Sequence, residues 1–76
     1  MKELVEYLAR QLVDDPDAVR VEPIERDGDL VYQLFVAKED VGKVIGRQGR
    51  IARALRTVVR ASAARRDQRV FLEIVE

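Results

Sequence analysis

The chain has 76 residues, enough for one domain over residues 1–76, with 14 basic and 14 acidic residues and neither cysteine nor histidine. It can therefore form no disulfide, no thiolate or imidazole metal site and no Ser-His or Cys-His nucleophile pair, so we expect no metal and no cofactor. The apolar runs are too short to span a membrane, and the charges at Lys2, Glu3 and Glu6 are unlike a signal peptide, which predicts a cytoplasmic protein without membrane association.

An amphipathic helix is predicted over residues 2–13, because apolar residues recur there at helical spacing. These residues are Leu4, Val5, Leu8 and Leu12. Glu3 stands in the first turn, where the helix dipole favours an acidic side chain. Pro16, in an aspartate-rich segment, predicts the end of the helix, since proline lacks an N–H and disfavours helix in the residue before it.

Two strands joined by a tight turn are predicted next. Residues 19–26 are predicted to be extended, and Pro23 favours an edge position because proline cannot donate within a central ladder. Asp27-Gly28-Asp29 is a turn signal between two β-like runs. Residues 30–37 are nearly all apolar or aromatic on both faces, which indicates a well-buried strand.

Two helices separated by a glycine turn are predicted in the second half of the chain. The first is a short helix over residues 41–45, with Asp40 as its N-cap. The second covers residues 50–65, where several alanines favour helix through their high propensity. The buried stripe of this long helix is predicted to contain Ile51, Leu55, Val58, Val59 and Ser62. Three arginines remain for its other faces: Arg53, Arg56 and Arg60.

A last strand is predicted over residues 69–75, where Val70, Leu72 and Ile74 alternate with Phe71, Glu73 and Val75. The predicted element order is therefore α-β-β-α-α-β. We expect an α+β fold in which a three-stranded sheet packs against three helices.

The turn between the two later helices contains Gly46 and Gly49, three positions apart. Glycine tolerates positive φ and lets another backbone approach closely, so Gly46-Arg47-Gln48-Gly49 can present backbone amides at the start of the following helix. Such a turn is suited to bind an anion.

Charge is separated along the chain although the net charge is zero. Residues 1–42 carry five basic and eleven acidic side chains, whereas residues 43–69 carry nine basic side chains and one acidic, Asp67. A local basic surface attracts phosphates even when the whole chain is neutral. An arginine-rich helix can also be merely solvated, but its position directly after a glycine turn favours a nucleic-acid ligand.

The turn and its flanks carry a recognisable motif. The segment VIGRQG at residues 44–49, followed by a helix, resembles the Gly-x-x-Gly signature of KH RNA-binding domains. The longer string VGKVIGRQGR at residues 41–50, continued by ALRTVV at residues 54–59, is similar to the small bacterial RNA-binding proteins that consist of a single KH domain. The likeness covers essentially the whole chain, and the predicted element order is the one associated with type II KH domains.

The resemblance implies that the turn holds the phosphates of single-stranded RNA, while a groove between the paired helices and a neighbouring strand takes about four nucleotides. The RNA-binding residues that it implies are Lys43, Val44, Ile45, Gly46, Arg47, Gln48, Gly49, Arg50 and Arg53. The groove floor would use Val41, Val44, Ile45 and Ile51, with one edge from residues 35–37. The resemblance also implies an RNA chaperone or RNA-binding regulator, linked with cell-envelope growth and cell-shape control, that forms a homodimer or a heterodimer with a larger KH-containing protein.

Sequence preference is expected to be weak. The four aromatic residues are Tyr7, Tyr32, Phe35 and Phe71, and none lies in the turn or on the long helix. The sequence therefore predicts no aromatic platform on which bases could stack, and binding through phosphates and shape is expected instead.

The sequence also bears on two other classes of function. An enzyme is disfavoured, because the turn lacks the lysine and hydroxyl of a nucleotide-binding P-loop and the acidic residues show no metal or acid–base spacing. The alternative that stays open is a KH-shaped dimerisation or protein-interaction module that scaffolds a partner protein, since Val58, Val59 and several alanines on the long helix could pair with another copy.

Overall fold

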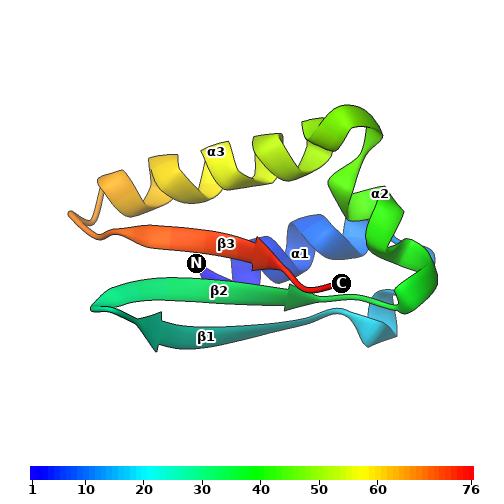
Figure 1. The fold of residues 1–76 in the computed structure, drawn as a ribbon, viewed down its shortest axis with the longest axis horizontal. Helices are drawn as coiled ribbons and strands as arrows, with labels where there is room; N and C mark the ends of the chain where they lie inside the picture. The colour runs from blue at the N-terminus through cyan, green and yellow to red at the C-terminus, as the bar shows by residue number, and fades with distance from the viewer.

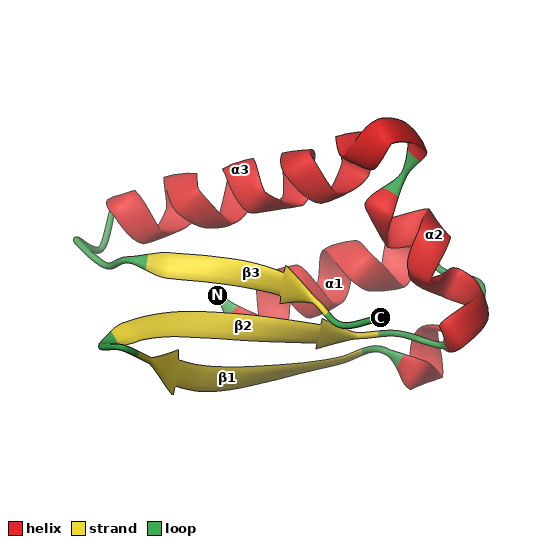
Figure 2. Cartoon of the chain, in the orientation of Figure 1, coloured by secondary structure: helices red, strands yellow, loops and turns green.

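The computed structural model describes residues 1–76 and forms two layers, a sheet and the helices that cover one of its faces (Figures 1 and 2). The main elements are α1 (Lys2–Leu12), β1 (Arg20–Arg26), β2 (Asp29–Phe35), α2 (Val41–Ile45), α3 (Arg50–Ala64) and β3 (Val70–Ile74). Single 3₁₀ turns cover Pro16–Ala18, Lys38–Asp40 and Arg47–Gly49. The predicted order α-β-β-α-α-β is confirmed, with boundaries that differ from the predictions by one or two residues.

The β1–β2 hairpin forms at the predicted turn. The two strands are antiparallel, and Arg26 pairs with Asp29 across Asp27 and Gly28. Asp27 and Gly28 have positive φ values of 54° and 84°. Two successive positive φ values are typical of the tight hairpin turn whose twist matches that of the flanking strands. The strand order is β1-β2-β3, so β1 is an edge strand, as Pro23 predicted.

The second edge of the sheet belongs to β3, which pairs in parallel with the central strand β2. A parallel neighbour requires a crossover, and α2 and α3 provide it. In Figure 1, α3 runs alongside β3 from the right-hand end of the molecule to the left. The last strand therefore lies between the long helix and the rest of the sheet.

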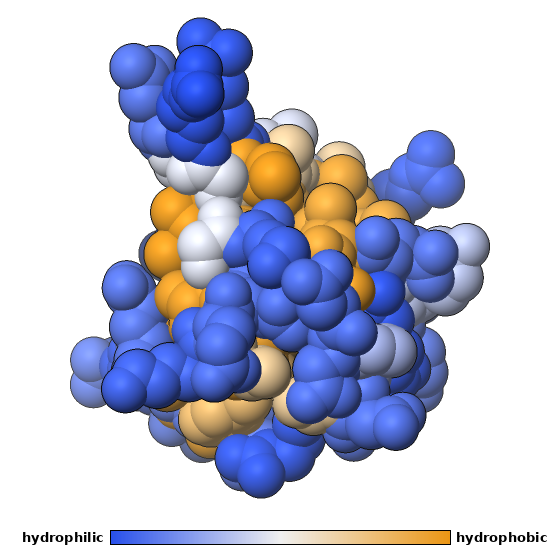
Figure 3. Space-filling view, turned by 90° about the vertical axis from the view of Figure 1, so that its right-hand side faces the viewer, coloured by the Kyte–Doolittle hydropathy of each residue, from blue (hydrophilic) through white to orange (hydrophobic).

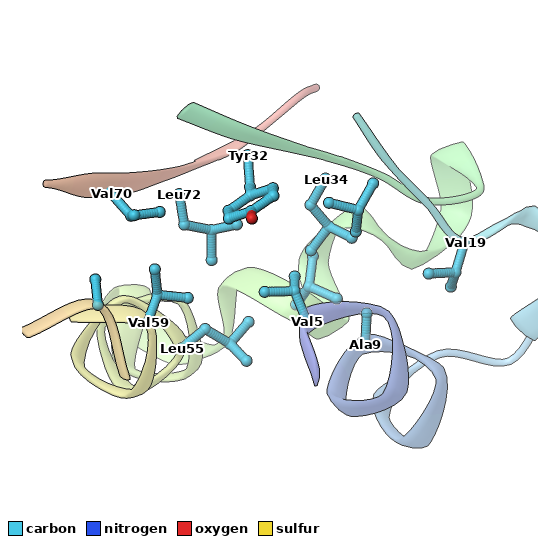
Figure 4. Close-up of a cluster of buried hydrophobic side chains, with 12 residues drawn as sticks. Val5, Ala9, Val19, Tyr32, Leu34, Leu55, Val59, Val70 and Leu72 are labelled. Carbon is cyan, nitrogen blue, oxygen red and sulfur yellow. The ribbon is translucent and has the colours of Figure 1, made fainter. Parts of the chain in front are cut away.

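The core fills the space between the sheet and the helices α1 and α3 (Figure 4). Figure 4 shows Tyr32, Leu34 and Leu72 pointing from the strands toward Val5 of α1 and Val59 of α3. No element lies in front of the strands in Figure 1, so the opposite face of the sheet is uncovered.

The predicted buried stripe of α3 was partly wrong. Leu55 and Val59 are buried as predicted, but the stripe is completed by Ala52 and Ala63, while Val58 is 38% exposed. Small side chains at Ala52 and Ala63 let the helix approach the sheet closely, so residues taken only as helix formers face the core. Ser62 is half-buried at the margin of this face.

Asp40 is the N-cap residue of α2, as predicted, but its side chain makes no capping hydrogen bond. The 3₁₀ turn before the helix already pairs the Val41 N–H with the Lys38 carbonyl. The Asp40 carboxylate, only 2% exposed, instead accepts hydrogen bonds from the Asp15 N–H at 3.0 Å and Lys43 Nζ at 3.4 Å. It thereby ties α2 to the loop that follows α1.

Candidate nucleic-acid interface

The Gly46-Arg47-Gln48-Gly49 turn is shaped by a close contact at Gly46. This residue has φ 78° and ψ 172°, a region that is open essentially only to glycine. A Cβ placed there would lie 2.7 Å from Cγ1 of Ile51, in the first turn of α3. The chain therefore folds back on the start of α3 only because position 46 carries no side chain.

The second half of the turn also has left-handed backbone. Gln48 has φ 57° and Gly49 has φ 73°, directly before α3 begins. Arg53 Nη2 donates to the Gln48 carbonyl at 3.2 Å, so the helix helps to hold the turn. Arg47 and Gln48 are both exposed. The turn therefore presents an arginine and an amide side chain at the N-terminal end of a fifteen-residue helix.

Lys43 is exposed but its charge is already matched. Its Nζ lies 3.1 Å from Asp14 Oδ2 and 3.4 Å from Asp40 Oδ1. The Asp14 carboxylate, with a smaller contribution from Asp40, raises the pKa of Lys43 above its usual range. Lys43 is thus a bridge between α2 and the loop after α1, a role that the sequence could not indicate because Asp14 is remote in the chain.

The apolar residues assigned to the site differ in exposure. Val44 is 0% exposed and belongs to the core cluster. Its side chain therefore packs in the core and presents no surface to a ligand. Ile45 and Ile51 are half-buried next to the turn. Figure 3, which views the end of the molecule where α2 meets α3, shows hydrophobic surface beside a projecting hydrophilic group.

The long helix has two different flanks. Arg56 and Arg60, together with Val70 and Leu72 of β3, line a shallow groove of about 200 Å³ between helix and strand. Arg56 Nε donates to the Leu72 carbonyl on the outer edge of β3 at 3.4 Å. The flank toward α1 is apolar instead, with Ile51, Ala54 and Val58 among the residues that line a hollow there.

Five arginines of the turn and α3 take part in no ion pair: Arg47, Arg50, Arg53, Arg56 and Arg60. They form a basic surface that begins at the turn and continues along the β3 side of the helix through Arg56 and Arg60, while Arg50 borders the hollow toward α1. Arg56 and Arg60 were not among the site residues expected from the sequence. Their spacing from Arg53, three and then four residues, places them on one side of α3 and could have indicated them.

Residues 35–37, which were expected to form one edge of the groove, do not border α3, because they continue from the central strand β2 toward α2. The strand beside α3 is β3, because the parallel crossover places the last strand at the sheet edge under the helix.

The structure contains neither a metal-binding cluster nor a membrane-spanning helix. No group of three or more acidic, histidine or cysteine side chains is placed to hold a metal ion. None of the helices combines the length and the apolar character needed to cross a membrane.

Comparisons with known proteins identify the family of this chain. Residues 2–74 match the family described as KhpA/KhpB, KH domain. The chain is 49% identical over 75 residues to the RNA-binding protein KhpA of Clostridium acetobutylicum, covering 99% of this chain and 100% of that protein. It is 52% identical over 75 residues to the KhpA of Caldanaerobacter subterraneus, with the same coverage.

A third relative, the RNA-binding protein KhpA of Listeria monocytogenes, is 49% identical over 76 residues and covers the full length of both chains. No solved structure gives a match. This is a family of KH domains and not of enzymes, which agrees with the non-enzymatic function expected from the sequence. The family match and the α-β-β-α-α-β order of a type II KH fold lead to one conclusion: the chain belongs to the KhpA/KhpB KH-domain family.

Proposed function

We propose that this chain binds single-stranded RNA at the Gly46-Arg47-Gln48-Gly49 turn and along the β3 side of α3. The observation that carries the proposal is the basic surface defined above, in which no arginine between the turn and Arg60 has a carboxylate partner. Unpaired guanidinium groups beside a glycine turn are free to meet phosphates. The relatives at about half identity are named as RNA-binding proteins.

The turn would fix the backbone of the strand. Arg47 and Arg50 supply charge at the end of α3, where the helix dipole also favours an anion. Arg53, Arg56 and Arg60 continue that charge over about 11 Å of helix, given the 1.5 Å rise per residue. The bases would then face the groove whose other wall is the outer edge of β3.

This arrangement favours low sequence specificity, because charge and shape contribute more than base edges do. We therefore propose an RNA chaperone or RNA-binding regulator that acts in the cytoplasm, where single-stranded RNA is available. The link with cell-envelope growth and cell-shape control comes from the family resemblance and not from any residue of the site.

The test is a fluorescence-anisotropy titration of short single-stranded RNA at two salt concentrations. The Arg47→Asp, Gln48→Asp double variant should lose most of the affinity, whereas wild-type affinity should fall with salt at a logarithmic slope of about −0.7 per phosphate contacted. Circular dichroism checks that the variant is folded.

The chain offers a matched control, because Arg10 and Gln11 form the same dipeptide at the end of α1. The Arg10→Asp, Gln11→Asp variant carries the same charge change away from the turn and should bind RNA as the wild type does. Its oligomeric state is measured alongside, since Gln11 borders the apolar hollow. Equal affinity of the two double variants would rule out the turn as the RNA site.

A second candidate function is a protein-interaction module, and the hollow between α1 and α3 favours it. This hollow of about 390 Å³ is lined by Leu8, Leu12, Ile51, Ala54, Leu55 and Val58, with Gln11 and Arg50 at its margin. A homodimer, or a heterodimer with a larger KH-containing protein, would cover this apolar surface. Light scattering after gel filtration should show a dimer that Val58→Asp converts to a monomer; a monomeric wild type would exclude the homodimer.

A further inference from the structure

Phe71, in the edge strand β3, exposes an aromatic ring next to the basic surface. Its neighbours Val70 and Leu72 point into the core, so alternation along the strand directs Phe71 to the uncovered face of the sheet. There it pairs with Val31 of β2 and remains 41% exposed. Val31, its register partner, is only 5% exposed, so the two neighbours on this face differ sharply in their access to solvent.

Arginines surround this ring. The guanidinium carbon of Arg69 lies 5.7 Å from the ring centroid. Arg56 and Arg60 line the groove that Phe71 shares with α3. Arg56 also lines a second hollow, on the uncovered face of the sheet, that includes Phe71 and Val31. Arg56 therefore stands where the groove beside α3 meets the open face of the sheet.

The charges around the ring are unequal on its two sides. On the open face, Arg26 is paired with Glu73 at 3.4 Å and Arg69 with Asp29 at 3.6 Å. On the side of α3, the two hollows that include Phe71 contain no carboxylate, and Arg60 lines both of them. A phosphate is thus favoured on the α3 side of the ring.

An exposed aromatic ring beside unpaired arginines has the chemistry of a site for one nucleotide, since the ring can stack on a base while a guanidinium meets the phosphate. Stacking of this kind is tolerant of sequence because every base has a flat face. We propose that Phe71 stacks a base of single-stranded RNA that has left the turn, followed α3 past Arg56 and reached the edge of β3. This site rests on the proposed function and lengthens the RNA segment that the domain holds.

The experiment compares tetrauridylate, which matches the groove of about four nucleotides, with octauridylate, which is long enough to reach Phe71. The Phe71→Leu variant keeps an apolar side chain beside Val31 but removes the aromatic ring. It should bind octauridylate roughly 5- to 150-fold more weakly than the wild type, the range expected when one base no longer stacks on an aromatic ring. Its affinity for tetrauridylate should be unchanged.

A second variant reports stacking directly, because the chain contains no tryptophan. In Phe71→Trp the single indole should keep the affinity for octauridylate, and its fluorescence should be quenched by octauridylate but not by tetrauridylate. Tyr7 provides a matched control, since it is 60% exposed on α1, a helix that contributes no residue to the basic surface. Tyr7→Leu should bind both oligonucleotides as the wild type does.

The outcomes separate this site from the function on which it rests. If the wild type binds RNA in a manner that depends on Arg47 and Gln48, yet Phe71→Leu binds octauridylate equally well, only the stacking site is overturned. Equal losses for the two lengths, or an unquenched Phe71→Trp, would overturn it as well. If the wild type binds neither oligonucleotide, the proposed function fails together with the stacking site.

Discussion

At the scale of single residues, the turn depends on the absence of a side chain at position 46. Gly46 combines a backbone conformation that other residues avoid with a contact that leaves no room for a Cβ. Gly49 differs, because its φ of 73° is also left-handed but a Cβ added there would have no atom within 4 Å. Two glycines of one motif thus serve different purposes: the first permits a close approach to Ile51, and the second only reverses the chain before α3.

The difference predicts unequal effects of alanine. Gly46→Ala should lower the free energy of unfolding by about 2–5 kcal/mol, from backbone strain and overpacking together. Gly49→Ala should cost about 1–2 kcal/mol, from left-handed backbone alone. Urea denaturation measures both values.

Ile51→Ala removes two of the atoms that a Cβ at position 46 would meet, Cγ1 and Cδ1. The double variant Gly46→Ala, Ile51→Ala should therefore be more stable than the sum of the two single losses predicts. Additive losses would show that the contact with Ile51 does not shape the turn.

At the scale of elements, α3 separates a basic flank from an apolar flank, although the residues of the two flanks are interspersed along the sequence. Its buried face is set by Ala52, Leu55, Val59 and Ala63. That orientation of the helix directs Arg56 and Arg60 toward β3 and leaves Val58, with Arg50, on the flank toward α1. The RNA strand and the protein partner proposed above would therefore occupy opposite flanks of the same helix.

This separation predicts which arginines affect RNA binding. Arg56→Gln, Arg60→Gln should weaken binding and make the logarithmic salt slope less steep by about 0.7 for each phosphate that the variant no longer neutralises. The variant Arg65→Gln, Arg66→Gln removes the same charge just beyond the end of α3, outside the groove, and serves as the control. Anisotropy titrations over a range of salt concentrations measure both slopes, and equal changes in the two variants would mean that net charge alone attracts the RNA.

At the scale of the whole molecule, a polar network joins segments that are distant in the chain. Asp40 and Lys43, before and within α2, meet Asp14 and the Asp15 backbone, which follow α1. Burial by itself would raise the pKa of Asp40, but hydrogen bonds from the Asp15 and Asp14 amides and from Lys43 lower it below the ordinary value of 3.8. The network therefore favours an ionised carboxylate in the interior.

Because the pKa of Asp40 is lowered in the folded state, the fold should become less stable in acid. A carboxyl whose pKa is lower in the folded state stabilises the fold above its unfolded pKa, and that contribution disappears as the pH falls through the folded pKa. We expect the urea midpoint of the wild type to fall as the pH drops below about 4. The Asp40→Asn variant should have a lower urea midpoint than the wild type at neutral pH, and its urea midpoint should fall less steeply in acid. Some fall should remain, because the pKa values of Glu3 and Glu73 are also lowered. Parallel declines in the two proteins would show that Asp40 is not responsible.

Much of the fold could be predicted because its signals are local. Apolar spacing indicated both long helices, Asp27 and Gly28 indicated the hairpin turn, and Pro23 indicated an edge strand. The Gly46-Arg47-Gln48-Gly49 turn was also evident, since glycine spacing reports the local backbone. Asp40 was correctly predicted as the N-cap residue, but its hydrogen bond to the Asp15 N–H was not, because the two residues are far apart in the chain.

By itself the sequence determined the order of the elements, the place of the glycine turn and the concentration of arginine after it, since each depends on neighbouring residues. Only the tertiary structure decided that Lys43 is paired with Asp14, that β3 and not residues 35–37 borders α3, and that Phe71 lies exposed among arginines. These features arise when segments far apart in the chain pack around one core, and local spacing does not specify which segments will meet.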